Sequence, residues 1–96
     1  MNKDIQNGID LLTKHFGEGW QDRIDLERLD MNDCAYCVVG QLFDDYGIAV
    51  REELRLSRDG EISHGFWTRK NTDEAWKELD REWHEYFENR KWKLAP

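Results

Sequence analysis

Two cysteines are the residues of this sequence whose types and spacing match a recognised chemical motif. Cys34 and Cys37 are separated by two residues, and thiolates at that spacing can chelate zinc or form a redox couple. A zinc site needs four ligands, and His64 is the imidazole that would best join the two thiolates. The sequence offers no second closely spaced ligand pair and no βαβ pattern around this one. We therefore expect no bound metal and no cofactor, with both cysteines packed in the core as small apolar side chains.

Catalytic chemistry has no comparable motif. Carboxylates are abundant, but runs such as Asp44-Asp45 have the spacing of a solvated surface, and nothing places two of them in a cleft. His64 precedes Gly65, a position typical of the end of a turn, where the ring can bind backbone carbonyls. These patterns predict that the protein is not an enzyme and has no small-molecule substrate.

The tryptophans indicate contact with another macromolecule. Four of the five lie in the last 30 residues, and tryptophan is a residue often found at binding hot spots. Trp76 and Trp83, seven residues apart on one helical stripe, are predicted to lie in the core, whereas Trp67 and Trp92 lie off that stripe. The residues predicted to contact a partner are Trp67, Trp92, Phe43 and Tyr46.

The composition limits the class of partner. The 96 residues carry a formal net charge of −7, which opposes binding to phosphates, so we expect no direct contact with nucleic acid. The acidity suits either a solvated exterior or an acidic face that docks on a basic partner. No apolar run is long enough to cross a bilayer, and we expect a cytoplasmic protein that does not bind a membrane. With 39% hydrophobic residues, the whole chain, 1–96, is predicted to fold as a single domain.

The segments at the two ends of the chain are predicted to form helices. Over residues 2–16, apolar residues recur every three or four positions, and Gly17 ends the pattern. The last helix follows Asn71 or Thr72, whose side chain can cap its first turn. Both helices are expected to pack against a central one.

The central helix is predicted over residues 34–46. Asn32 or Asp33 would cap it, Gly47 would end it, and its buried face would carry both cysteines. Gly40 lies inside this helix, where glycine costs about 1 kcal/mol relative to alanine. We therefore expect a neighbouring backbone to approach Gly40 closely.

Residues 54–66 carry two conflicting patterns. Asp59-Gly60 between alternating apolar residues predicts a β-hairpin. The same segment also predicts a helix, with Ser57 as its N-cap and Gly65 as its left-handed end. The predicted fold is mainly α, a compact domain of three to four helices, with a short β-hairpin at about 54–66 as the alternative.

Two motifs, Cys34-Ala-Tyr-Cys-Val-Val-Gly-Gln-Leu-Phe43 and His64-Gly65-Phe66, resemble those of small uncharacterised proteins from actinobacteria and their phages. The resemblance covers roughly residues 20–83, although Val39 stands where leucine is usual. It implies a helix before the second motif and a phage or prophage accessory protein inside a bacterial cell. It assigns no chemistry to any residue.

We therefore expect a small acidic accessory protein that binds a host protein without catalysing a reaction, and whose effect on that protein could be inhibitory. Self-association is the other kind of partnership that the sequence leaves open. The alternative function is a zinc-stabilised structural or sensor module that uses Cys34 and Cys37.

Overall fold

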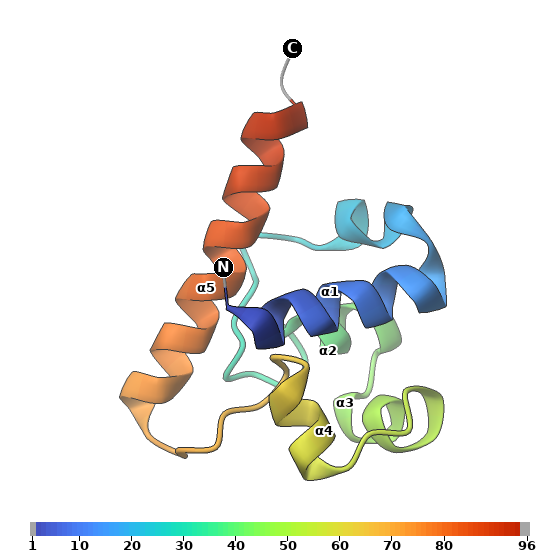
Figure 1. Cartoon of the computed structure of the whole chain (residues 1–96), viewed down its shortest axis with the longest axis vertical. Coiled ribbons are helices and arrows are strands. Elements are labelled where there is room, and N and C mark those ends of the chain that lie inside the picture. Colours follow the sequence, from blue (N-terminus) through green and yellow to red (C-terminus); the bar gives the residue numbers. More distant parts are fainter. Residues whose placement is uncertain (1, 95–96) are drawn as a thin grey trace.

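The computed structural model describes the backbone of residues 2–94 and the side chains of residues 2–90. The elements are, in chain order, α1 (Lys3–Phe16), the 3-10 helix η1 (Glu18–Arg23), α2 (Val38–Phe43), α3 (Tyr46–Ile48), the π-helical turn η2 (Ala49–Glu53), α4 (Arg58–Ser63) and α5 (Asp73–Leu94). The chain is 65% helical and the described residues contain no strand, which confirms the predicted mainly-α class. In Figure 1, α5 runs along one side of the molecule, and α1 begins beside it and crosses the other elements. Within the described part of the chain, no helix is both long enough and apolar enough to cross a membrane.

The first helix forms as the sequence predicts. Asn2 caps α1, because its side-chain oxygen accepts a hydrogen bond from the Asp4 amide at 2.8 Å. The apolar stripe is buried, and Ile5 and Leu12 are both 0% exposed. Gly17 ends the helix with a φ of 83°, a left-handed value that glycine adopts without strain.

The central helix begins later than predicted, and neither Asn32 nor Asp33 caps it. The N-cap of α2 is Cys37, whose Sγ accepts from the Gly40 amide at 3.3 Å. The Asp33 carboxylate instead accepts from the Ala35 amide at 2.8 Å and stabilises a turn. Local side-chain bonds of this kind compete with helix formation, so the turn that carries the cysteines stays outside α2.

The predicted end of the central helix is also wrong. Asp44 takes a left-handed φ of 74° and stops α2, so Tyr46 belongs to the separate helix α3. Asp45 caps α3 by accepting from the Ile48 amide at 3.0 Å, and Gly47 lies inside α3 rather than at a helix end. Two consecutive aspartates thus act as a stop and a cap where the apolar periodicity predicts one continuous helix.

Gly40 makes the close approach that the sequence predicts. A Cβ at this position would lie 2.0 Å from the carbonyl oxygen of Cys34 and 3.0 Å from the carbonyl carbon of Ala35. Real Cβ atoms do not come this close to backbone atoms. The cysteine turn therefore packs directly on the α2 backbone, and only glycine allows that contact.

The segment with conflicting patterns forms the helix α4, and the alternative β-hairpin is wrong. Ser57 caps α4, because its Oγ accepts from an amide of the first turn at 3.1 Å. Gly65 takes a φ of 72°, and the Phe66 amide donates to the Glu61 carbonyl at 2.9 Å, which closes the helix end. The chain then directs Phe66 into the core, where it is 1% exposed.

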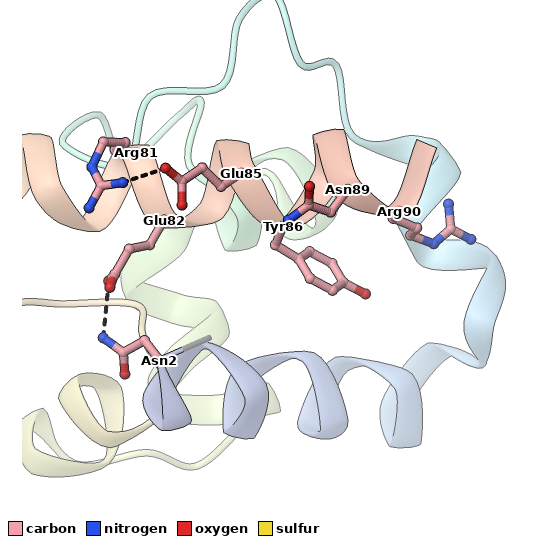
Figure 2. Close-up of a pocket in the computed structure, with 7 residues that line it drawn as sticks. All are labelled: Asn2, Arg81, Glu82, Glu85, Tyr86, Asn89 and Arg90. Atoms are coloured by element: carbon pink, nitrogen blue, oxygen red, sulfur yellow. Dashed lines mark hydrogen bonds and ion pairs between the residues drawn. The ribbon is translucent and has the colours of Figure 1, made fainter. Parts of the chain in front are cut away.

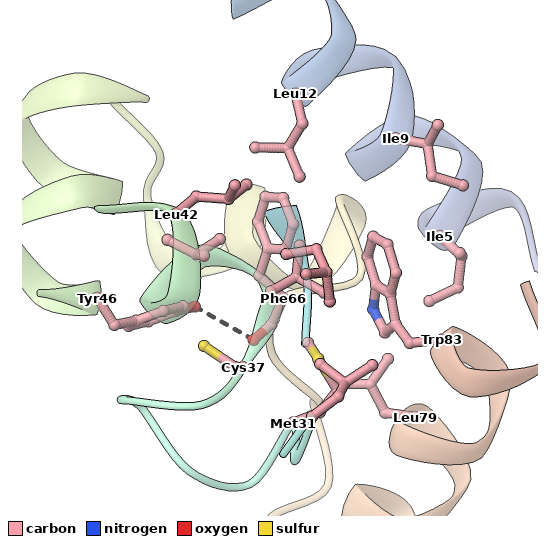
Figure 3. Packing of buried hydrophobic residues seen from close by; sticks show 14 of the residues in the cluster. Ile5, Ile9, Leu12, Met31, Cys37, Leu42, Tyr46, Phe66, Leu79 and Trp83 are labelled. Carbon is pink, nitrogen blue, oxygen red and sulfur yellow. Dashed lines mark hydrogen bonds between the residues drawn. The ribbon is translucent and has the colours of Figure 1, made fainter. Parts of the chain in front are cut away.

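Aromatic side chains hold α5 to the other elements. Trp83 is 0% exposed, and its ring stacks with those of Phe66 and Phe87 at centroid distances of 6.2 and 6.0 Å. Its indole nitrogen donates to the Gly65 carbonyl at 2.7 Å, at the end of α4. Figure 3 shows the Trp83 ring beside Ile5 of α1. α5 is therefore joined to α4 and α1 through its buried face.

Both residues predicted to cap the last helix contribute to its start. Thr72 accepts from the Ala75 amide through Oγ1 at 3.2 Å, which satisfies a donor of the first turn. Asn71 accepts from the indole nitrogen of Trp76 at 3.0 Å. The side chains of Thr72 and Asn71 thus fix the first turn of α5, one by binding a backbone amide and the other by binding an indole nitrogen.

Replacing Gly40 by alanine is expected to destabilise the fold. The added methyl group would meet the Cys34 carbonyl, so the cysteine turn must shift, and we expect the free energy of unfolding to fall by about 1–3 kcal/mol. Thermal unfolding followed by circular dichroism would record a lower Tm. The matched control is Gly19→Ala, because a Cβ at Gly19 meets no atom within 4 Å. Equal Tm values for the two variants would contradict the close approach.

Candidate functional site

A small cavity beside the cysteine turn brings together residues that the sequence singles out for different reasons. It has a volume of about 40 Å³ and is lined by Met31, Asn32, Cys34, Cys37, Tyr46, Phe66, Trp67 and Trp76. The two cysteines are the predicted metal or redox pair, and Tyr46 and Trp67 are predicted partner contacts. A cavity of this size has room for about one water molecule, so it is too small for an organic ligand.

The two cysteines occupy different environments. Cys37 is 2% exposed, and burial raises the pKa of its thiol to about 12. Cys34 is exposed, because it lies in the turn before α2 rather than on the buried face of a helix. The prediction that both cysteines pack in the core is confirmed for Cys37 and wrong for Cys34.

The geometry does not favour the alternative zinc site. The His64 ring binds a backbone carbonyl, as predicted, with Nδ1 at 2.7 Å from the Gly60 oxygen, and it stacks with Phe66 at 6.4 Å. Cys37, the buried member of the pair, directs its Sγ to the Gly40 amide at the start of α2. In residues 2–90, no three His, Cys, Asp or Glu side chains are grouped so that they could hold a metal ion.

Tyr46 lies in the core, which corrects its assignment as a partner contact. It is 6% exposed, and its hydroxyl donates to Oε1 of the buried Glu61 at 2.7 Å. The carbonyl oxygen of Phe66 lies 3.2 Å from the same hydroxyl, as drawn in Figure 3. Burial and the carboxylate of Glu61 raise the pKa of Tyr46. The side chain therefore links α3 to α4 instead of facing solvent.

Trp67 is half-buried and is one of the residues that line the small cavity. Its ring contacts Trp76 at a centroid distance of 5.0 Å and Tyr46 at 6.0 Å. The guanidinium of Arg58 lies 3.6 Å from the Trp67 ring centroid, and its Nε is 3.6 Å from Oε2 of Glu61. Because the guanidinium covers part of the indole, only the remainder of the Trp67 ring is open to a partner.

The other predicted partner contacts lie elsewhere. Phe43 is half-buried in a separate cluster, with its ring 5.1 Å from that of Phe16 and 5.6 Å from that of His15. Arg23 lies over Phe16 at 5.3 Å, so this cluster also has a cation on one face. The side chain of Trp92 lies outside the described residues. The four predicted contacts therefore do not form a single surface.

A larger groove opens between the start of α1 and the second half of α5 (Figure 2). It has a volume of about 650 Å³ and is lined by Asn2, Arg81, Glu82, Glu85, Tyr86, Asn89 and Arg90. Glu82, Glu85, Tyr86 and Asn89 are spaced by three, one and three residues, so they share one face of α5. Its size is that of a site for a small molecule or a short peptide.

The sequence patterns did not predict this groove, which is lined by Tyr86 and by two glutamates of α5. The structure places both kinds of residue at the boundary between the two faces. The sequence does contain a signal for the α5 wall of the groove, because polar residues at helical spacing lie next to the apolar stripe of this helix. The second wall, which includes Asn2, comes from the other end of the chain and has no local signal.

Ion pairs hold the side chains along the groove. Arg81 binds the carboxylates of both Glu78 and Glu85, one turn away on either side along α5. Nη1 of Arg90 is 3.4 Å from Oδ1 of Asp22, which lies in η1. Glu82 accepts a hydrogen bond from the Asn2 carboxamide at 3.0 Å. The groove lining thus carries two guanidinium groups and two carboxylates, and the other carboxylates that pair with the arginines, Glu78 and Asp22, lie outside the lining.

Tyr86 forms the aromatic part of the groove. Its hydroxyl donates to Oε1 of Gln21 at 2.7 Å, and burial raises the pKa of Tyr86. Its ring packs edge-on against Trp83 and Phe87 at centroid distances of 6.4 and 5.3 Å. Tyr86 is therefore held at both ends, with its ring at the groove. The charged, carboxamide and phenol side chains that line the groove could bind a polar ligand by hydrogen bonds and charge.

The sequence and structure were compared with known proteins. No family model matches the sequence, and no curated protein or solved structure is significantly similar to it.

The thiols are expected to differ in reactivity. In the native protein a water-soluble aromatic disulfide reagent should modify Cys34 quickly and the buried Cys37 at least about 100-fold more slowly. Absorbance of the released thiol would show one fast equivalent in native protein and two after unfolding. Cys34→Ser should remove the fast phase, and Cys37→Ser is the matched control that should retain it. Two equally fast equivalents in the native protein would contradict this arrangement.

Stability is expected to fall at alkaline pH. The folded pKa values of Cys37 and Tyr46 lie above the ordinary values of 9.0 and 10.0, so above pH 9.0 the unfolded chain loses protons that the native protein keeps. The free energy of unfolding should then decrease by up to about 1.4 kcal/mol per pH unit for each group, for Cys37 until about pH 12.

Urea unfolding measured at a series of pH values would test this dependence. Tyr46→Phe should flatten the slope that begins above pH 10.0, because it removes one of the two titrating groups. Tyr36→Phe is the control, since Tyr36 is 41% exposed. A slope that Tyr46→Phe leaves unchanged would show that the hydroxyl of Tyr46 is not the group that titrates.

Proposed function

We propose that this chain is a small acidic accessory protein, of phage or prophage type, that binds another protein of the host cell through the groove between α1 and α5. The observation that carries the proposal is the groove itself, an opening of about 650 Å³ lined by an aromatic residue, two arginines and two glutamates. Its role is to bind rather than to catalyse, and its effect on the partner could be inhibitory.

The charge of the molecule supports a basic partner. A formal charge of −7 on 96 residues creates a field that accelerates encounters with positively charged surfaces. The exposed face of α5 adds to this field next to the groove, since Glu78, Glu85 and Glu88 are all exposed. Association should therefore weaken as salt screens these charges.

The groove side chains support a binding role over acid–base catalysis. Arg81 and Glu85 are paired with each other, and Tyr86 is held by its bond to Gln21. A catalytic acid or base needs a pKa near the working pH, whereas the pKa of Tyr86 is raised further above its ordinary value of 10.0. The phage or prophage origin is supported by the sequence resemblance.

Site-specific photo-crosslinking would test the proposal. A photoreactive phenylalanine analogue at Asn89, in the groove, should give a reproducible adduct with one host protein in an actinobacterial extract. The same group at Glu53, an exposed position in η2, is the matched control and should not give that adduct. Raising salt from about 50 to about 300 mM should reduce the yield, because the charges are exposed.

Two results would count against the proposal. An Asn89 probe that gives no adduct beyond those of the Glu53 probe would remove the groove as the binding surface. An adduct whose yield does not change with salt would remove the contribution of the acidic charge.

A further inference from the structure

We propose that the small cavity beside the cysteine turn binds a soft monovalent metal ion, Cu(I), through the sulfur atoms of Cys34, Cys37 and Met31. All three residues line this cavity of about 40 Å³, and Figure 3 shows the two that are buried, Cys37 and Met31. The proposal goes beyond the proposed function, because the cavity and the groove share no lining residue.

The cysteine turn places its two thiols on the same side. The Cys37 amide donates to the Asp33 carbonyl at 2.8 Å, which is the hydrogen bond of one α-helical turn. Residues i and i+3 of such a turn are neighbours, so Cys34 and Cys37 both reach the cavity. The Asp33 carboxylate stabilises the turn by accepting from the Ala35 amide at 2.8 Å. The backbone therefore positions the pair before any ion binds.

The third sulfur comes from the segment that leads into this turn. The Asp30 amide donates to the Tyr36 carbonyl at 3.3 Å, so the chain folds back and carries Met31 to the cavity. The Met31 amide donates to Oδ1 of Asp80 at 2.8 Å, which fixes the backbone there to α5. A methionine side chain is unbranched and flexible, so its thioether can turn toward an ion without movement of the backbone.

The donor set selects a soft ion. Thiolate and thioether ligands favour Cu(I), whereas zinc sites use four ligands drawn from Cys, His, Asp and Glu. Within residues 2–90, no three side chains of those four types are grouped so that they could hold a metal ion. The other residues that line the cavity are one carboxamide and four aromatic residues, namely Asn32, Tyr46, Phe66, Trp67 and Trp76. Sulfur is therefore the main donor available, and Cu(I) accepts fewer ligands than zinc.

Backbone amides stabilise the charged form of the buried thiol. The Gly40 amide donates to Sγ of Cys37 at 3.3 Å. Burial raises the pKa of this thiol, whereas hydrogen bonds from the Gly40 and Val39 amides lower it. When Cu(I) binds, each thiol releases its proton to solvent, and the positive charge of the ion offsets the cost of burying the Cys37 thiolate. The amide hydrogen bonds stay directed at the ligand atom, as is usual around metal ligands.

The cavity has the size and the access that a single ion needs. It has room for about one water molecule, which is enough for an ion but too small for a chelated complex. Cys34 is exposed, whereas Cys37 and Met31 are 2% and 3% exposed. An ion from solvent therefore contacts Cys34 first and then the two buried sulfur atoms.

Anaerobic titration of the reduced full chain with Cu(I) would test the site. In competition with a chromogenic Cu(I) chelator, the protein should take up about one equivalent, and native mass spectrometry should show one copper on one chain. Cys34→Ser should weaken the Kd for Cu(I) at least about 100-fold, because a hydroxyl replaces a thiolate. Ala35→Ser, in the same exposed turn, is the matched control and should leave the Kd within about twofold. No uptake against the chelator, or equal Kd values for wild type and Cys34→Ser, would overturn the proposal.

Met31→Leu tests the thioether separately from the packing. Leucine and methionine have similar volumes, so the variant should stay folded, as circular dichroism would verify. Its Kd for Cu(I) should rise about tenfold, because one of the three sulfur ligands is lost. An unchanged Kd would show that Met31 is not a ligand and would overturn the three-sulfur site.

Other ions separate this site from its alternatives. Zn(II) should not displace Cu(I) at up to about 100-fold excess, whereas Ag(I), a soft ion of the same charge, should compete. Bound Ag(I) should also remove the fast reaction of Cys34 with the aromatic disulfide reagent. Displacement by Zn(II), one copper shared by two chains, or a fast thiol reaction that Ag(I) leaves unchanged would each contradict the assignment. Capture of a host protein by the Asn89 probe is independent of all these results.

Discussion

The hydrogen bond from the indole of Trp83 to the Gly65 carbonyl joins three elements at one point. Gly65 ends α4, and a Cβ on it would lie 3.2 Å from the Asp4 carbonyl in the first turn of α1. A single side chain of α5 therefore fixes α5 against both α4 and α1. The groove depends on this junction, because it places the Asn2 end of α1 beside Glu82 while the bodies of the two helices diverge.

A second buried polar contact organises the opposite side of the core. Tyr46 and Glu61 are both almost completely covered, and they satisfy each other through a short hydrogen bond. Leaving either group without its partner would cost about 1–3 kcal/mol. Arg58 pairs with Glu61 and also lies over the ring of Trp67, so this guanidinium connects the buried contact to an aromatic residue. Tyr46, which was predicted to contact a partner, therefore serves the fold.

Local signals predicted α1 and the end of α4 well. The stripe of α1 and the Gly65 stop after α4 depend on neighbours within about one or two turns, and such patterns are visible in the sequence. The bounds of the central helix were mispredicted because the apolar periodicity continues through residues that form turns in the structure. Asp33, Asp44 and Asp45 use their side chains or a left-handed backbone to make turns, and these alternatives outweigh the periodicity.

The candidate site was less visible for a different reason. An aromatic residue type does not reveal which side of the surface it will occupy, and Tyr46, which was predicted to contact a partner, is only 6% exposed. The groove also needs contacts such as Asn2 with Glu82 and Gln21 with Tyr86, which join distant parts of the chain. No pattern within one segment can contain such a pair.

The sulfur atom of Cys37 caps the first turn of α2, and this weak cap makes local opening of that turn easier. Sulfur is a weak hydrogen-bond acceptor, so Cys37 holds the Gly40 amide less firmly than an aspartate or serine oxygen would. The first turn of α2 is therefore a place where the native state can open without unfolding as a whole. Amide protons there would exchange with solvent through brief local excursions, while those of α5 around Trp83 would stay protected until the whole domain comes apart.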